Sequence, residues 1–165
     1  MSKILDSGDR TQFDTGAVRD MQKGKGRCDL LPLDVAALLL APRGETENQV
    51  LYWLNRFQGH GNPDALREAL YHFVRYHYAL GGSRSGMLLE TSKQFEDGAE
   101  KYGENNWQKG IPVKVYINSA VRHYLKWVRG DEDEPHDRAF CWNIMCAWWT
   151  CIHKPELNDY AKSDA

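Results

Sequence analysis

The segment HDRAFCWNIMCAWWTCIHK, residues 136–154, has apolar side chains on nearly every side of the helix that it predicts. A helix of this kind is buried all round, either in the centre of a bundle or against another chain. We expect the other helices of a chain this short to leave part of it uncovered. The sequence therefore predicts an all-α fold, a helical bundle completed by oligomerisation.

Five other segments repeat apolar residues at helical spacing and are bounded by proline or glycine. They predict helices over residues 30–42, 45–59, 63–80, 87–102 and 112–130, so that the bundle has about five or six helices. Residues 1–29 are polar and predict an extended arm or loop, and no segment alternates convincingly as a strand. The chain is expected to form one domain over residues 1–165.

The charge and the apolar content exclude several classes of protein. A net charge of −2 gives no bulk attraction for nucleic acid, so no nucleic-acid partner is expected. No apolar run is long enough for a membrane span, and the N-terminus has no signal-peptide core. Four cysteines, three of them spaced by five in the last helix, predict reduced and mostly buried thiols. We expect a cytoplasmic protein.

Two acidic sets stand out. Glu96, Asp97 and Glu100 occupy the end of a predicted helix, where carboxylates meet the unfavourable end of the helix dipole. The second set is DEDEPHD, in which Glu134 and Asp137 are three residues apart. Acidic helix faces are usually only solvated. However, helical bundles also use carboxylates on neighbouring helices to bind metal ions. A bound Mg²⁺ or Mn²⁺ would relieve the repulsion between the carboxylates.

The two sets together bear a resemblance to a known family. Glu96-Asp97-x-x-Glu100 followed by Glu134-x-x-Asp137 resembles the EExxE…ExxD pattern of the MazG-like all-α nucleoside triphosphate pyrophosphatases. GKGRCDLLP, FEDGAEKYGENNWQKGIP, SAVRH and the helix containing Trp142-Asn143 are similar to a phage branch of dATP/dGTP diphosphohydrolases, whose MazZ members act on guanine nucleotides. The chain departs from the family at Asp97, in a longer gap between the sets, and at Pro135.

This resemblance implies hydrolysis of a purine (deoxy)nucleoside triphosphate, (d)GTP above all, to the monophosphate and pyrophosphate, in phage nucleotide metabolism. It also implies a metal-dependent enzyme that shares its bundle between chains as a homodimer or homotetramer. The expected catalytic metal ligands are Glu96, Glu100, Glu134 and Asp137, with Asp133 as the alternative to Glu134. Which carboxylate acts as the general base stays open.

Five further side chains are candidates for substrate binding, and each has a plainer alternative. They are Lys101 (phosphate contact or solubility), Asn106 (base edge or turn), Trp107 (base stacking or loop anchor), Arg122 (a polar residue within an apolar helix pattern, for substrate or for a structural ion pair) and His136 (a partner to the metal ligands or a helix start).

Two rival functions remain. The dipeptide His136-Asp137, with His123, favours an HD-type metal-dependent phosphohydrolase, but Glu96 and Glu100 would then have no task. A non-enzymatic helical interaction protein is the other rival, with six tryptophans supplying an interface. DEDEPHD lacks the spacing of an EF-hand, so a calcium sensor is excluded.

Overall fold

The computed structural model describes residues 8–77 and 83–162. Within these residues it contains six α-helices, which confirms the predicted all-α bundle, and none of them combines the length and apolar composition needed to cross a membrane. The α-helices are α1 (Leu33–Leu39), α2 (Gln49–His60), α3 (Asp64–His77), α4 (Ser83–Tyr102), α5 (Val113–Arg129) and α6 (His136–His153). Short 3₁₀ turns are η1 (Cys28–Leu30), η2 (Asn106–Lys109) and η3 (Pro155–Leu157).

Local signals fix the two ends of α2. The Asn48 side chain accepts a hydrogen bond from the Leu51 backbone nitrogen at 3.1 Å, which caps the first turn. Gly61 ends the helix with a φ of 66°, and a Cβ at this position would lie 2.6 Å from the backbone of Ala161. Only glycine fits there, so the helix runs just past Gly59, where the sequence predicted its end. The Gly81-Gly82 end predicted for the next helix lies outside the described residues.

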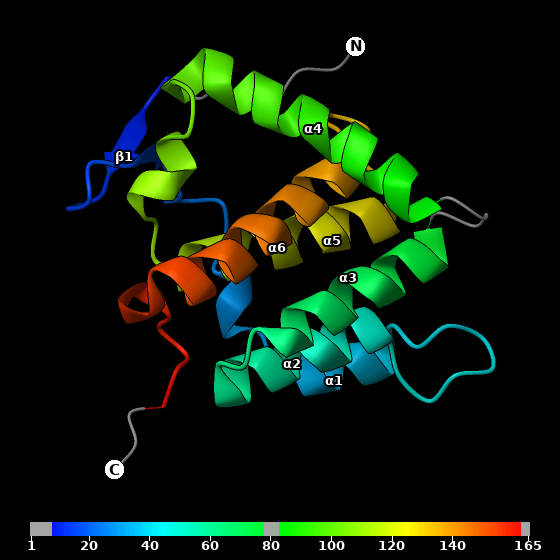
Figure 1. The fold of residues 1–165 in the computed structure, drawn as a ribbon. Helices are drawn as coiled ribbons and strands as arrows, with labels where there is room; N and C mark the ends of the chain where they lie inside the picture. Colours follow the sequence, from blue (N-terminus) through cyan, green and yellow to red (C-terminus); the bar gives the residue numbers. More distant parts are fainter. Residues whose placement is uncertain (1–7, 78–82, 163–165) are drawn as a thin grey trace.

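The helices surround a central pair. In Figure 1, α5 and α6 lie side by side, α4 crosses α6 on one side, and α1, α2 and α3 lie on the other. Aromatic side chains fill the space between α3 and the pair: the Phe73 ring centroid lies 4.6 Å from that of Phe140, which lies 5.6 Å from that of Tyr124. The core therefore sits on one side of α5 and α6, and the side toward the end of α4 holds polar groups.

The other helices bury most of α6. Cys141, Ile144, Cys146 and Ala147 are fully buried, whereas Met145, Trp148 and Trp149 are only partly buried and Ile152 is exposed. α3, α4 and α5 pack around α6, but they leave the face with Met145, Trp148, Trp149 and Ile152 partly exposed, as expected from the sequence. The four cysteines are free thiols and three are buried, as predicted. Oligomerisation stays a prediction.

The N-terminal arm is more ordered than predicted. Strand β1 (Arg10–Gln12) pairs antiparallel with β2 (Val18–Asp20), so the expectation of no strands is wrong for this short hairpin. Strands this short are marginal alone and show no alternation pattern. The hairpin is held by a distant side chain, since Asn106 bonds both the backbone nitrogen and the carbonyl of Val18 at 2.9 and 2.8 Å.

Candidate active site

A cleft of about 560 Å³ opens where the N-terminal hairpin meets the helices. This volume is in the range of small-molecule sites, roughly 300–1,000 Å³. Its walls come from four parts of the chain, within residues 18–25, 94–111, 119–126 and 134–143. The cleft therefore depends on contacts between segments that are far apart in the sequence.

Both cationic and acidic side chains line this cleft. Its cationic side chains are Arg19, Lys25, Lys101, Arg122 and Lys126, and its acidic ones are Asp20, Glu96, Glu104 and Glu134. Clustered cations favour a ligand with several negative charges, such as a polyphosphate. Carboxylates on the same wall would repel that ligand unless a cation lay between them.

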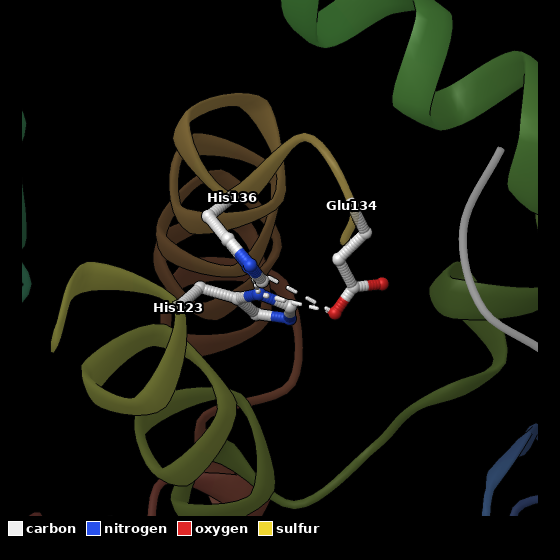
Figure 2. Close-up of side chains that lie close together, drawn as sticks. All are labelled: His123, Glu134 and His136. Carbon is white, nitrogen blue, oxygen red and sulfur yellow. Dashed lines mark hydrogen bonds and ion pairs between the residues drawn. The ribbon is translucent and has the colours of Figure 1, made fainter. Parts of the chain in front are cut away.

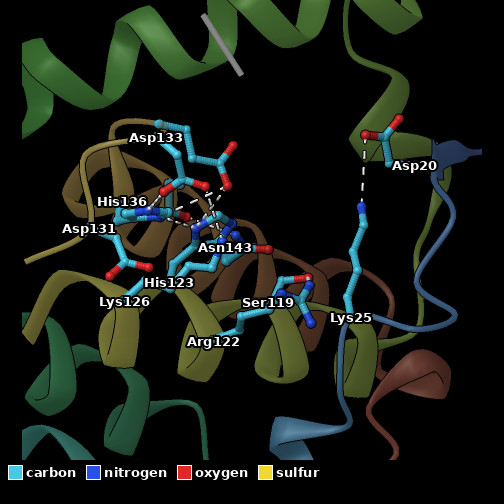
Figure 3. A network of polar contacts seen from close by, with 12 residues as sticks. Asp20, Lys25, Ser119, Arg122, His123, Lys126, Asp131, Asp133, His136 and Asn143 are labelled. Atoms are coloured by element: carbon cyan, nitrogen blue, oxygen red, sulfur yellow. Dashed lines mark hydrogen bonds and ion pairs between the residues drawn. The ribbon is translucent and has the colours of Figure 1, made fainter. Parts of the chain in front are cut away.

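Asp20 ties the hairpin to the end of α4. This buried carboxylate accepts hydrogen bonds from Arg10 at 3.0 Å, Lys101 at 3.1 Å and the Tyr102 hydroxyl at 3.0 Å. Lys25 approaches the same carboxylate at 3.9 Å (Figure 3). Burial, followed by the nearby Asp20 charge, raises the pKa of Tyr102, so its hydroxyl keeps the proton that it donates. Lys101, a predicted phosphate contact, is thus already ion-paired at the cleft wall.

Arg19 reaches across the cleft to α6. Its Nη2 donates to Asn143 Oδ1 at 2.6 Å, and its guanidinium lies 5.3 Å from the ring centroid of Tyr116 and 5.4 Å from that of Trp142. Cation–π contacts of this kind stabilise a partly desolvated arginine. Arg19 and Asn143 therefore fasten the hairpin over α6 from the cleft side.

Two histidines and Glu134 meet at the other end of the cleft. Figure 2 shows the rings of His123 and His136 facing each other, with their Nδ1 atoms 3.0 Å apart. Glu134 Oε1 lies 3.6 Å from His123 Nδ1 and 3.9 Å from His136 Nδ1. Burial, with His136 and Arg122 adding to it, lowers the pKa of His123 well below its ordinary value, so this ring is neutral at neutral pH.

Asp133 orients His136 from outside the cleft. His136 is almost fully buried, and its Nε2 lies 2.7 Å from Asp133 Oδ1. The hydrogen bond from His136, together with Lys126, lowers the pKa of Asp133 to about 2, so the carboxylate is charged and Nε2–H is the donor. The Nδ1 lone pair of His136 then faces His123 and Glu134.

The α4 carboxylates are divided between different surroundings. Glu96 lines the cleft, whereas Asp97 forms an ion pair with Arg138 of α6 at 2.8 Å. Glu100 is exposed and does not line the cleft wall, and neither does Asp137. The departure at Asp97 from the family pattern thus coincides with a contact that holds α4 on α6.

Each group of donor atoms that could share an ion contains one of the predicted metal ligands, Glu134 or Asp133. Over residues 8–77 and 83–162, the groups of donor atoms close enough to share an ion are His123–Glu134–His136 and Asp131–Asp133–His136. Neither group contains a carboxylate of α4, although Glu96 and Glu134 line the same cleft. A cluster of Glu96 and Glu100 with Glu134 and Asp137 therefore stays a prediction.

The other predicted substrate contacts have structural partners of their own. Asn106 is buried and uses both ends of its amide on β2. The Trp107 ring packs edge-on against Phe95 and Trp149 yet lines the cleft. Arg122 also lines the cleft and donates to uncharged oxygens, including Gln22 Oε1 at 3.1 Å. Substrate contacts by these residues stay predictions.

Several cleft residues were not among the site residues predicted from the sequence, including Arg19, Asp20, Lys25 and Asn143. The N-terminal three lie in the arm, which showed no pattern that would place it against α6. Asn143 did carry a signal, because it is a polar residue in the middle of an otherwise apolar helix, and it is 2% exposed. A buried amide of this kind requires hydrogen-bond partners.

Comparison with known proteins identifies the family of the chain. A family model described as dATP/dGTP diphosphohydrolase, N-terminal, matches residues 74–160, slightly more than half of the chain. The chain belongs to this family. No curated protein and no solved structure matches it. The resemblance to the dATP/dGTP diphosphohydrolases found in the sequence is thus confirmed. The matched residues include α4, α5 and α6, whereas Arg19, Asp20 and Lys25 lie outside the match.

Proposed function

We propose that this dATP/dGTP diphosphohydrolase family member hydrolyses a purine deoxynucleoside triphosphate, with guanine preferred, to the monophosphate and pyrophosphate. One observation carries the proposal: within the family-matched region, a cleft combines Lys101, Arg122 and Lys126 with the carboxylates of Glu96 and Glu134. The purine preference is supported by the family description, and a role in phage nucleotide metabolism by the sequence resemblance.

The cations of the cleft bind the triphosphate. Arg122 presents a planar guanidinium that suits phosphate oxygens. Lys25 and Lys126 come from opposite sides, from the arm and from α5, and can hold the ends of an extended triphosphate. Trp107, whose ring lines the cleft, is the candidate for stacking on the base.

The acidic residues fit Mg²⁺ or Mn²⁺. Glu96 and Glu134 line the cleft and offer oxygen atoms, the donors that these hard cations prefer. Glu100 and Asp137, which do not line the cleft wall, are the other members of the set expected from the sequence. When bound, such an ion neutralises phosphate charge and activates water. A carboxylate of the set then serves as the general base: it accepts a proton from the attacking water as the bond between the α and β phosphates breaks.

The test is anion-exchange analysis of the products formed from all canonical NTPs and dNTPs with Mg²⁺ or Mn²⁺. We expect dGTP or dATP to give the monophosphate and pyrophosphate. Glu96→Gln should abolish most turnover, whereas the matched control Glu90→Gln should not, because Glu90 lies on the same helix, away from the cleft, and pairs with Lys93.

Other outcomes would favour the rival functions. Tripolyphosphate as a product would indicate an HD-type phosphohydrolase that uses His136-Asp137. No turnover of any nucleotide with either metal would favour a helical interaction protein. A pyrimidine with the highest kcat/KM would overturn the purine preference.

A further inference from the structure

We infer that His123, His136 and Glu134 bind a divalent transition-metal ion, Zn²⁺ or one of similar ligand preference. This site goes beyond the proposed hydrolysis, which requires only hard cations held by carboxylates. His123 comes from α5, Glu134 from the loop before α6, and His136 from the first turn of α6 (Figure 2).

The spacing of the three donor atoms fits one ion. Ligands bound at about 2.1 Å, at angles between a right angle and a straight line, are separated by about 3.0–4.2 Å. The three observed separations, 3.0, 3.6 and 3.9 Å, all fall within this range. A hydrogen-bonded histidine pair accounts for the shortest of them, and Glu134 Oε1 adds a third donor atom that lies near both Nδ1 atoms.

The surroundings of His136 are those of a metal ligand. Its Nε2–H donates to Asp133, which leaves Nδ1 as the atom that binds the ion. A carboxylate on the far nitrogen is the usual way in which proteins orient a metal-bound histidine and raise its basicity. The His136 side chain has no exposed surface, so its orientation is set by this contact and by packing.

The ligand types select the metal. Two imidazoles with one carboxylate suit Zn²⁺, Fe²⁺ or Co²⁺, whereas Mg²⁺ prefers oxygen ligands alone. His123 and Glu134 line the cleft, so the remaining coordination positions face it, as in sites with three protein ligands and an exchangeable water. The second oxygen of Glu134 points away from both rings (Figure 2).

The experiment measures metal binding without nucleotide. The protein is stripped with a chelator, exchanged into buffer and titrated with Zn²⁺ against a chromophoric competitor, and Co²⁺ is used for absorption spectra. We expect one Zn²⁺ per chain and a ligand-field spectrum with Co²⁺. Asp133→Asn should weaken Zn²⁺ binding about 10–100-fold, and His123→Gln should weaken it further.

Controls separate this site from its neighbours. His153→Gln changes an exposed histidine at the end of α6 and should leave Zn²⁺ affinity unchanged. Asp131→Asn tests the other donor group, and a loss as large as that of His123→Gln would move the ion there and overturn the inference. Equal Zn²⁺ affinity of His123→Gln and the unchanged chain would also overturn it.

Folding and function are read out separately. Circular dichroism and melting of each variant report folding, and Glu134→Gln, a change in a loop, repeats the test if His123→Gln unfolds. Loss of Zn²⁺ binding in a folded variant supports the site whether or not the chain hydrolyses nucleotides. The absence of nucleotide hydrolysis would therefore not contradict the Zn²⁺ site, and the absence of Zn²⁺ binding would not contradict the proposed hydrolysis.

Discussion

Asn48 joins three helices through one buried side chain. Its Oδ1 caps α2 at Leu51, and its Nδ2 donates to the Tyr124 hydroxyl of α5 at 2.7 Å and to the carbonyl of Leu40, after α1, at 3.3 Å. Asn48→Ala removes the cap, at a cost of about 1 kcal/mol. It also leaves the buried Tyr124 hydroxyl without the Asn48 amide as its hydrogen-bond partner, which costs about 1–3 kcal/mol. The free energy of unfolding should therefore fall by roughly 2–4 kcal/mol in total.

Thermal and urea denaturation followed by circular dichroism would measure this change. For a chain of this length the loss corresponds to a fall in Tm of roughly 5–15 °C. The matched control is Asn62→Ala, since Asn62 is an exposed cap that accepts a bond from the Asp64 backbone nitrogen at 3.0 Å. It should cost about 1 kcal/mol or less, because only a cap is lost.

A double mutant isolates the buried bond. Adding Tyr124→Phe to Asn48→Ala removes the hydroxyl that has lost its partner, so the double variant should be more stable than Asn48→Ala alone. The coupling energy should be about 0.5–3 kcal/mol. Equal costs for Asn48→Ala and Asn62→Ala, with no coupling to Tyr124, would refute the reasoning.

Four further predictions concern the site, its metal, the response to pH and the assembly. Glu100→Gln should lower kcat by orders of magnitude if α4 supplies a metal ligand as predicted, and turnover within about twofold of normal in a folded variant would mean a solvated face. Excess EDTA should abolish turnover, and added Mg²⁺ or Mn²⁺ should restore it; unchanged activity in EDTA would contradict a metal requirement. Burial lowers the pKa of His77 below its ordinary value of 6.5, with Asp137 opposing the shift, so the unfolded chain binds the proton more readily and stability should fall as pH drops below 6.5. His77→Phe, which keeps the packing on Phe73, should lose less stability than the unchanged chain between about pH 7.5 and about pH 5.5 in urea titrations, and an equal loss would assign the effect to other groups. Light scattering should give a multiple of the 19.0 kDa chain mass, whereas a mass of one chain at micromolar concentration would contradict the oligomer.

The helices could be predicted because their signals are local. The apolar faces repeat at helical spacing, and Gly130 marks the end of α5, whereas the ends of α2 at Asn48 and Gly61 differ from the predicted bounds of 45–59. The burial of α6 followed from its composition. The helices that cover α6 could not be predicted in the same way, because they depend on how α3, α4 and α5 pack, which no single segment encodes.

The cleft was only partly predictable for the same reason. Glu96, Lys101, Arg122 and Glu134 were found from motifs within short segments, and all four line it. Arg19 belongs to the site only because of contacts with Asn143 and the rings beside it. His123 and His136 are 13 residues apart and meet because α5 and α6 pack together, a distance that sequence spacing alone does not give.

The hairpin contacts set an order of assembly. Arg19 leaves the ribosome early, but its partner Asn143 follows 124 residues later, and the partner of Val18, Asn106, follows 88 residues later. Contacts between such distant residues form only after a large loop has closed, which slows folding. The Arg19–Asn143 contact therefore forms only after α6 has been synthesised, so the cleft is completed late in the folding of a new chain.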